Sequence, residues 1–153
     1  MANPSVITIK DKKVKKLLKD LIKQTGKISQ RSRDYVALLG AVVLEDVEDH
    51  FNKQQGPSGP WAAWSPAYKA RMSRLGKSGN FILTDTGRLR KGWQPARHRT
   101  SKKGVLWFNP VSYASLHNDG SSKMPKRHFA WLSKRALTKM EKFTAKFMLK
   151  TNG

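Results

Sequence analysis

The 153-residue chain has no cysteine and no long run of apolar residues. Without cysteine it cannot form disulfides or cysteine-based metal sites, so its stability must come from packing, including packing against partner subunits. A membrane span would need a run of about 18 apolar residues, and a signal peptide would need an apolar segment near the N-terminus. The sequence shows neither, which predicts no membrane partner and a protein made and kept in a cytosol-like compartment.

Acidic residues are also scarce, because the chain has 10 Asp and Glu but 31 Lys and Arg, and the formal net charge is +21. Such a charge attracts polyanions and acidic surfaces but carries no information about the fold. The basic residues crowd both ends of the chain, while four of the ten acids fall at 45–49. This distribution suits copies that associate head to tail, and it equally suits a protein that is simply basic.

The lysine-rich helices allow a second interpretation, in which they neutralise the phosphates of DNA. Such binding is weakly sequence-specific and weakens as the salt concentration rises. No zinc finger, base-reading helix or aromatic strand motif supports sequence-specific recognition. The plainer interpretation is a solvated helix surface, and non-specific DNA binding is kept as the alternative function.

Apolar residues recur at helical spacing in three segments, which predicts helices over 11–24, 29–53 and 133–149. Gly26 is expected to end the first helix, and Ser29 or Ser32 to cap the second. Residues 5–9 have the β-branched content of a short strand, or of an arm added to a neighbour's sheet. The basic strand and helix over 1–27 are a candidate arm for packing on a neighbouring subunit.

The segment from Gln54 to Pro66 holds three prolines and two glycines. Because proline donates no backbone hydrogen bond, we expect no regular element there. Ser65 before Pro66 predicts the capped start of a short helix that runs towards Arg74, and Gly76 and Gly79 are expected to end it. Further on, Thr84 or Asp85 is expected to cap one helical turn over 88–91, which Gly92 ends.

Residues 93–109 read as two short strands around the polar sequence SKKG, which predicts an antiparallel hairpin with its turn at 101–104. Pro95 is then expected at a strand start or on an edge. Ser112 is expected to cap a short helix through Leu116. The predicted fold is α+β, a single domain over 1–153 with a small antiparallel sheet around this hairpin. The long helix in the N-terminal half and the C-terminal helix pack against the sheet.

The residues that could carry chemistry are few. The four histidines lie on different predicted elements, and no HxH, HxxxH or HExxH spacing joins two of them. Two pairs combine the residue types of a general base and the carboxylate that orients it. They are Asp49 with His50 and His117 with Asp119. No acidic cluster suited to magnesium accompanies either pair. A helix-end histidine and a turn aspartate explain them more simply, so we predict no catalytic residue, no metal, no cofactor and no enzyme.

Two tryptophans stand out in the proline-rich loop. Trp61 and Trp64 are three residues apart, and large rings in such a loop often anchor interfaces. The alternative is a loop folded onto the core of its own chain, and the sequence leaves both open. Near the last helix, Lys126 and Arg127 sit beside a rigid proline, which favours a contact between subunits.

Four short segments in fixed order carry a family resemblance: GPSGPWAAWSP at 56–66, ILTDTGRLRKGW at 82–93, SYASLHNDG at 112–120 and KMPKRHFAWLS at 123–133. They resemble the phage virion morphogenesis family, the tail-completion proteins that include the Mu-type G protein. The matching residues are Gly56, Pro57, Gly59, Pro60, Trp61, Trp64, Leu83, Thr86, Gly87, Leu89, Tyr113, Ala114, His117, Gly120, Met124, Pro125, Arg127 and Phe129. The chain departs from the family pattern at His128, where a second proline is usual, and at Asn118, where glutamine is common.

The resemblance implies a structural virion protein of the tail or neck, present in the host cytoplasm during assembly. Its partners would be copies of itself in a closed ring, with six subunits as the family suggests, together with the tail tube and the head connector or neck proteins. The ring would cap the tail tube and join head to tail, and DNA would pass through its lumen. The loops at 54–65, 75–82 and 118–128 are the expected contact surfaces. The candidate interface residues are Trp61, Trp64, Arg88, His117, Asp119, Lys126 and Arg127.

Overall fold

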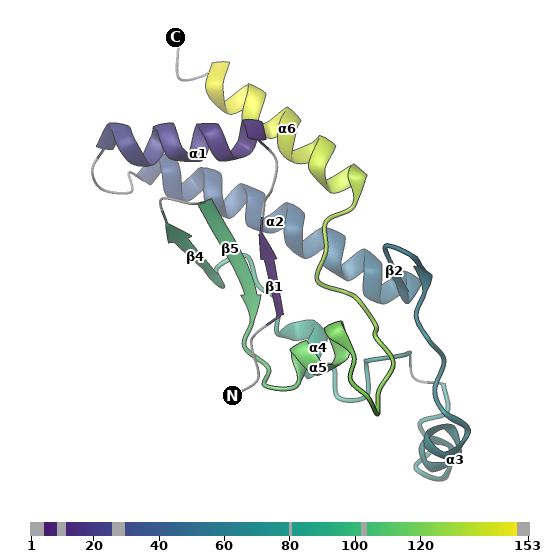
Figure 1. The fold of residues 1–153 in the computed structure, drawn as a ribbon. Helices are drawn as coiled ribbons and strands as arrows, with labels where there is room; N and C mark the ends of the chain where they lie inside the picture. Colours follow the sequence, from purple (N-terminus) through teal and green to yellow (C-terminus); the bar gives the residue numbers. More distant parts are fainter. Residues whose placement is uncertain (1–4, 9–11, 26–29, 80, 102–103, 150–153) are drawn as a thin grey trace. The chain divides into compact units, whose positions relative to one another are not determined.

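The computed structural model describes residues 5–8, 12–25, 30–79, 81–101 and 104–149 (Figure 1). The elements in chain order are β1 Ser5–Thr8, α1 Lys12–Thr25, α2 Gln30–Lys53, β2 Gln55–Gly56, β3 Gly59–Pro60, α3 Pro66–Arg74, α4 Arg88–Lys91, β4 His98–Ser101, β5 Gly104–Asn109, α5 Ala114–Asp119 and α6 Lys134–Leu149. The α+β prediction is confirmed. The three long helices are confirmed as well, each within a residue of its expected bounds.

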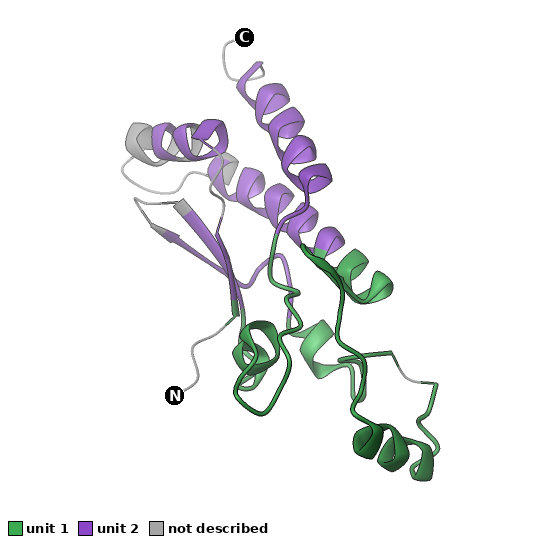
Figure 2. Cartoon of the chain, turned by 45° about the vertical axis from the view of Figure 1, so that its right-hand side comes forward, with its two compact units in different colours: residues 1–5, 47–92, 109–131 green, residues 6–46, 93–108, 132–153 purple. Residues whose placement is uncertain are grey.

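The contacts group the chain into two compact units (Figure 2). Unit 1 comprises 1–5, 47–92 and 109–131, and unit 2 comprises 6–46, 93–108 and 132–153. Helix α2 runs through the boundary between residues 46 and 47, so each unit contains part of it. The expectation of one domain over 1–153 stays a prediction.

Unit 2 contains most of the three-stranded sheet, whose strand order is β1-β5-β4. Strands β4 and β5 are antiparallel, and their register pairs His98 with Trp107 and Ser101 with Gly104. The predicted hairpin is thus confirmed, although residues 102–103 of its expected turn lie outside the described residues. Strand β1 is hydrogen-bonded to β5 of the same chain, and α1 lies beside α6 (Figure 1). Packing of the 1–27 arm on a neighbour stays a prediction.

Helix α2 packs closely against the hairpin within unit 2. A Cβ added at Gly40 would lie 2.8 Å from the indole nitrogen of Trp107, so only glycine fits at this contact. That nitrogen donates to the carbonyl of Pro95 at 3.2 Å. Pro95 does not start a strand as expected, because it lies in a turn closed by a bond from Arg97 N to Gln94 O. The fixed φ of Pro95 suits the turn, and its carbonyl accepts the hydrogen bond of the buried indole.

The start of α6 is attached to α2 through one buried carboxylate. Asp46 is 2% exposed and accepts from the backbone nitrogen of Ser133 at 2.7 Å and from its hydroxyl at 2.5 Å. The Ser133 hydroxyl in turn accepts from Ala136 N, which caps the helix. Lys139 binds Glu45, and Arg135 lies 3.9 Å from Asp46.

The rest of the acidic cluster at 45–49 is also paired within the chain, now in unit 1. Arg90 donates to Glu48 and to Asn52, and Lys53 binds Asp49 at 2.7 Å. All four carboxylates of the cluster therefore have a basic partner in their own chain. This pairing weakens the case for a head-to-tail contact between copies that would use the cluster.

In unit 1, the expectation of no regular element between 54 and 66 is wrong. Strands β2 and β3 form a two-residue hairpin that pairs Gln55 with Pro60 and Gly56 with Gly59. Pro57 lies in the turn, so its missing N–H costs no ladder bond. Gly59 has a φ of 123°, which a larger residue would rarely adopt.

Helix α3 begins and ends as its sequence predicts. The Ser65 hydroxyl accepts from Tyr68 N at 3.3 Å, and Pro66 is the first helical residue. At the other end, Gly76 has a φ of 69° and donates to Ser73 O, while Lys77 N donates to Met72 O. These two bonds make a Schellman motif, which satisfies carbonyls that the last turn leaves unpaired.

Two predicted caps are wrong. Helix α4 has Gly87 at its N-cap, in a left-handed conformation, in place of Thr84 or Asp85. Helix α5 begins after Tyr113, not after Ser112, and runs on through Asp119. Of the two candidate caps for α2, Ser32 lies inside the helix and Ser29 lies outside the described residues, so the cap of α2 stays a prediction. The N-cap residues of α4 and α5 make no side-chain hydrogen bond to the first turn.

Candidate partner-binding cavity

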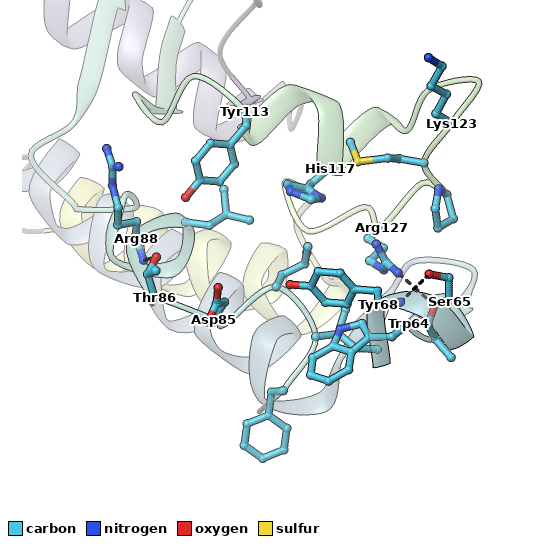
Figure 3. Close-up of a pocket in the computed structure, with 18 residues that line it drawn as sticks. Trp64, Ser65, Tyr68, Asp85, Thr86, Arg88, Tyr113, His117, Lys123 and Arg127 are labelled. Atoms are coloured by element: carbon cyan, nitrogen blue, oxygen red, sulfur yellow. Dashed lines mark hydrogen bonds between the residues drawn. The ribbon is translucent and has the colours of Figure 1, made fainter. Parts of the chain in front are cut away.

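Unit 1 contains a cavity of about 580 Å³ to which all four sequence segments contribute (Figure 3). Ten of the residues that carry the family resemblance line it: Trp64, Leu83, Thr86, Gly87, Leu89, Tyr113, His117, Met124, Pro125 and Arg127. Segments that lie up to about sixty residues apart in the chain therefore meet at one place. Its size is within the range of about 300–1,000 Å³ that is usual for ligand pockets.

One wall is aromatic and comes from the start of α3. The rings of Trp64 and Tyr68 meet edge to face with their centroids 5.3 Å apart. The Ser65 cap fixes the start of the helix between them, which sets the direction of both rings. Tyr68 is 37% exposed, so this wall presents aromatic surface that the chain does not cover.

A second wall is the loop from Phe81 to Gly87. The side-chain oxygen of Gln54 accepts from Ile82 N at 2.8 Å and holds the loop to the end of α2. Leu83 has a φ of 62°, a left-handed conformation that costs a non-glycine residue about 1–3 kcal/mol. Such strain persists only where the surroundings impose it, and it often marks functional sites.

Helix α5 provides the third wall. Tyr113 and His117 lie one turn apart, with their rings edge to face at 5.7 Å. Nδ1 of His117 is buried and has no hydrogen-bond partner among the described residues. Burial, and then the charge of Arg127, lower the pKa of His117, which is therefore neutral at pH 7. Gly120 ends α5 with a φ of 76°, and a Cβ there would lie 2.8 Å from Lys126 N.

Arg127 joins two of the loops around the cavity. Its Nε and Nη2 atoms donate to the carbonyls of Ala62 and Ala63 at 2.9 and 3.1 Å, and its backbone nitrogen donates to His117 O at 2.9 Å. Only 8% of the residue is exposed. Burial lowers the pKa of Arg127, and the nearby Tyr68 opposes this effect. The guanidinium is thus a fixed positive charge in the cavity wall.

The lining carries more positive than negative charge. The lining has three cationic side chains, those of Arg88, Lys123 and Arg127, and one carboxylate, that of Asp85. Asp85 is already bound to Lys77 at 2.7 Å. An acidic ligand would therefore meet no uncompensated negative charge in the lining. Figure 3 shows Tyr68, His117 and Arg127 around the opening, whereas the side chains of Arg88 and Lys123 extend outward from its rim.

The structure separates the seven predicted interface residues into two groups. Trp64, Arg88, His117 and Arg127 line the cavity, whereas Trp61, Asp119 and Lys126 do not. Trp61 is 6% exposed and packs edge to face on Phe51, so its ring belongs to the core of its own unit. Its indole nitrogen donates to His128 O at 3.1 Å. That these seven residues contact a partner stays a prediction.

The structure gives other partners to members of the two candidate base-and-carboxylate pairs. The Asp119 carboxylate accepts from Asn118 Nδ2 at 2.7 Å, and it does not orient His117 Nδ1, which is unpaired. His50 stacks on Trp131 with ring centroids 4.2 Å apart, and its Nδ1 bonds Phe129 O. Within the described ranges, no three side chains of metal-ligating type gather at one place. The arrangement fits binding better than acid–base chemistry.

Of the lining residues, Tyr68 alone lies outside the four segments and the expected contact loops, while Phe81 and Lys123 lie in those loops but were not singled out. Phe81 is 55% exposed, and its signal in the sequence is a large aromatic residue in a glycine-rich polar loop. Tyr68 follows the Ser65 cap by three residues, which places it on the first turn of α3. Lys123 opens the fourth segment and lies in the expected contact loop at 118–128, where only its charge distinguishes it from its neighbours.

Among the described helices, none is both long enough and apolar enough to cross a membrane. No curated protein and no solved structure matches the chain. The model of the phage virion morphogenesis family matches residues 9–146, which is most of the chain. Membership of this family points to a structural and not a catalytic role. The chain belongs to the phage virion morphogenesis family, and it is a virion-associated protein with a structural role in phage assembly.

Proposed function

We propose that the protein is a tail-completion subunit that caps the tail tube and joins it to the head at the neck. The observation that carries this proposal is the meeting of all four family segments at one open cavity. A chain that needed these segments only for its core would bury them. Here Trp64, Met124 and Arg88 of the segments line a space that a partner can enter.

The subunits form a closed ring, with six copies as the family resemblance implies. A closed ring needs two different complementary surfaces on each subunit. The basic arm over 1–27 and the loops at 54–65, 75–82 and 118–128 are the proposed surfaces. The partners beyond the ring are the tail tube on one side and the head connector or neck proteins on the other, with the genome passing through the lumen.

Gene deletion with complementation tests the proposal. Phage that lack the protein are expected to give filled heads and separate tails in electron microscopy, and the wild-type gene supplied in trans is expected to restore joined particles. Purified chain mixed with tail tubes should sediment with the tubes as a discrete oligomer. Joined, infectious particles without the protein would refute the proposal, and so would a chain that stays monomeric with and without tubes.

Non-specific DNA binding is the second candidate, and one surface favours it. Lys134, Arg135, Lys139 and Lys142 line a shallow groove on α6. Glu45 binds Lys139 and Asp46 lies near Arg135, so the acids of α2 offset part of this charge. Duplex DNA should then shift with a steep dependence on salt. An absence of binding at about 50 mM salt would remove this candidate.

A further inference from the structure

We propose that the cavity binds an extended acidic segment of another virion protein, with a carboxylate and a large apolar side chain close together. This inference rests on the proposed structural role and names the chemistry of the partner. It assigns the contact to one place on unit 1, whereas the resemblance implies partners without saying how any of them is recognised.

The apolar part of the segment is inferred from the lining. Phe81 is 55% exposed and Tyr68 is 37% exposed, and both rings border the same cavity as Met124. Large apolar side chains in contact with water are costly, and grouped around a cavity they mark a binding site. An inserted aromatic or aliphatic side chain would cover them and act as the anchor of the interface.

The acidic part is inferred from the charges. Arg88 and Lys123 are exposed cations at the cavity, and Arg127 is a buried one. The two carbonyl bonds of Arg127 hold its guanidinium in place, so little side-chain entropy is lost when a carboxylate binds. Partial burial also strengthens the attraction, since the local dielectric constant is lower than that of water.

A second copy of this chain fits the cavity poorly. The densest acidic stretch, at 45–49, has each of its four carboxylates paired inside its own chain. Duplex DNA fits poorly too, because a cavity of about 580 Å³ with aromatic walls admits a few side chains and not a double helix. The partner is therefore a different protein, and its acidic segment matches the +21 charge of this chain.

Photo-crosslinking in assembled particles tests the inference. Phe81 is replaced by p-benzoylphenylalanine, and Leu75 receives the same group as the control. Leu75 is 56% exposed and lies in the same unit, but it does not line the cavity. We expect position 81 to crosslink at least fivefold more than position 75. The product should map by mass spectrometry to an Asp- and Glu-rich segment of another virion protein.

Charge variants give the second measurement. Arg88→Gln with Lys123→Gln removes two exposed cations of the lining. Lys69→Gln with Arg74→Gln is the matched control, because it removes two exposed cations of α3 that do not line the cavity. The lining variant should lower the crosslinking yield from position 81 about two- to tenfold, as expected for two exposed charge pairs. The control variant should leave the yield unchanged.

Several outcomes would overturn the inference. They are a crosslink to a copy of this chain or to DNA, equal yields at 81 and 75, no product in particles that contain the protein, or equal effects of the two charge variants. Failure of the proposed function is a separate result, because the wild-type chain would then be absent from purified particles.

Discussion

Replacing Asn118 by alanine tests how the cavity is held together. Asn118 is 7% exposed, and its side-chain oxygen accepts from the backbone nitrogens of Phe129 and Ala130 at 3.1 and 2.9 Å. It thereby joins α5, which contributes His117 to the cavity, to the segment that directly follows the lining residue Arg127. Alanine would leave two buried N–H groups without a partner.

The expected cost follows from these two groups. Each buried N–H left unsatisfied costs about 1–3 kcal/mol, so Asn118→Ala should lower the free energy of unfolding by about 2–6 kcal/mol. A domain of about 150 residues loses about 3 °C in Tm per kcal/mol, so the midpoint should fall by about 6–18 °C. Asn118→Gln keeps the amide. It should recover part of the loss.

Urea unfolding followed by tryptophan fluorescence measures this cost. Asn52→Ala is the matched control, because Asn52 is exposed and accepts one bond from Arg90 at 2.7 Å. The control should cost less than about 1 kcal/mol. If Asn118→Ala unfolded within about 0.5 kcal/mol of the wild type, the two bonds would not hold the cavity walls together, and the reasoning would be refuted.

Three further predictions concern packing and pH. Trp61→Ala should cost about 3–5 kcal/mol, because its ring is buried in unit 1, and a loss below about 1 kcal/mol in urea would contradict this. Gly92→Ala should cost about 1–3 kcal/mol, because its Cβ would lie 2.2 Å from a buried amide oxygen. Gly79→Ala, with open space around it, should leave Tm nearly unchanged, and equal melts for the two variants would be the contrary result. Burial lowers the pKa of His117 and of His128 from 6.5, so the unfolded chain binds more protons as the pH falls. Stability should therefore be level above about pH 6.5 and fall below it, and the double variant with glutamine at both positions should flatten the profile.

The regular helices could be predicted because their signals are local. The apolar stripe from Tyr35 to Phe51 has helical spacing, and most of its members are buried as expected. The cap at Ser65 and the stop at Gly76 also depend only on residues within one turn. The small hairpin at 55–60 was missed because two prolines argued against any strand. Neither proline occupies a position of the hairpin where a backbone N–H would have to donate a hydrogen bond to the other strand.

The sequence by itself determined the α+β class, the long helices, the hairpin at 93–109 and membership of the family. Each of these depends on periodicity or on short motifs, which act over a few residues. Only the tertiary structure decided that Trp61 is buried while Trp64 borders a cavity, and that the acids at 45–49 are paired within the chain. The physical reason is that burial and ion pairing depend on contacts between segments far apart in the chain, and the spacing of residues in the sequence does not encode those distances.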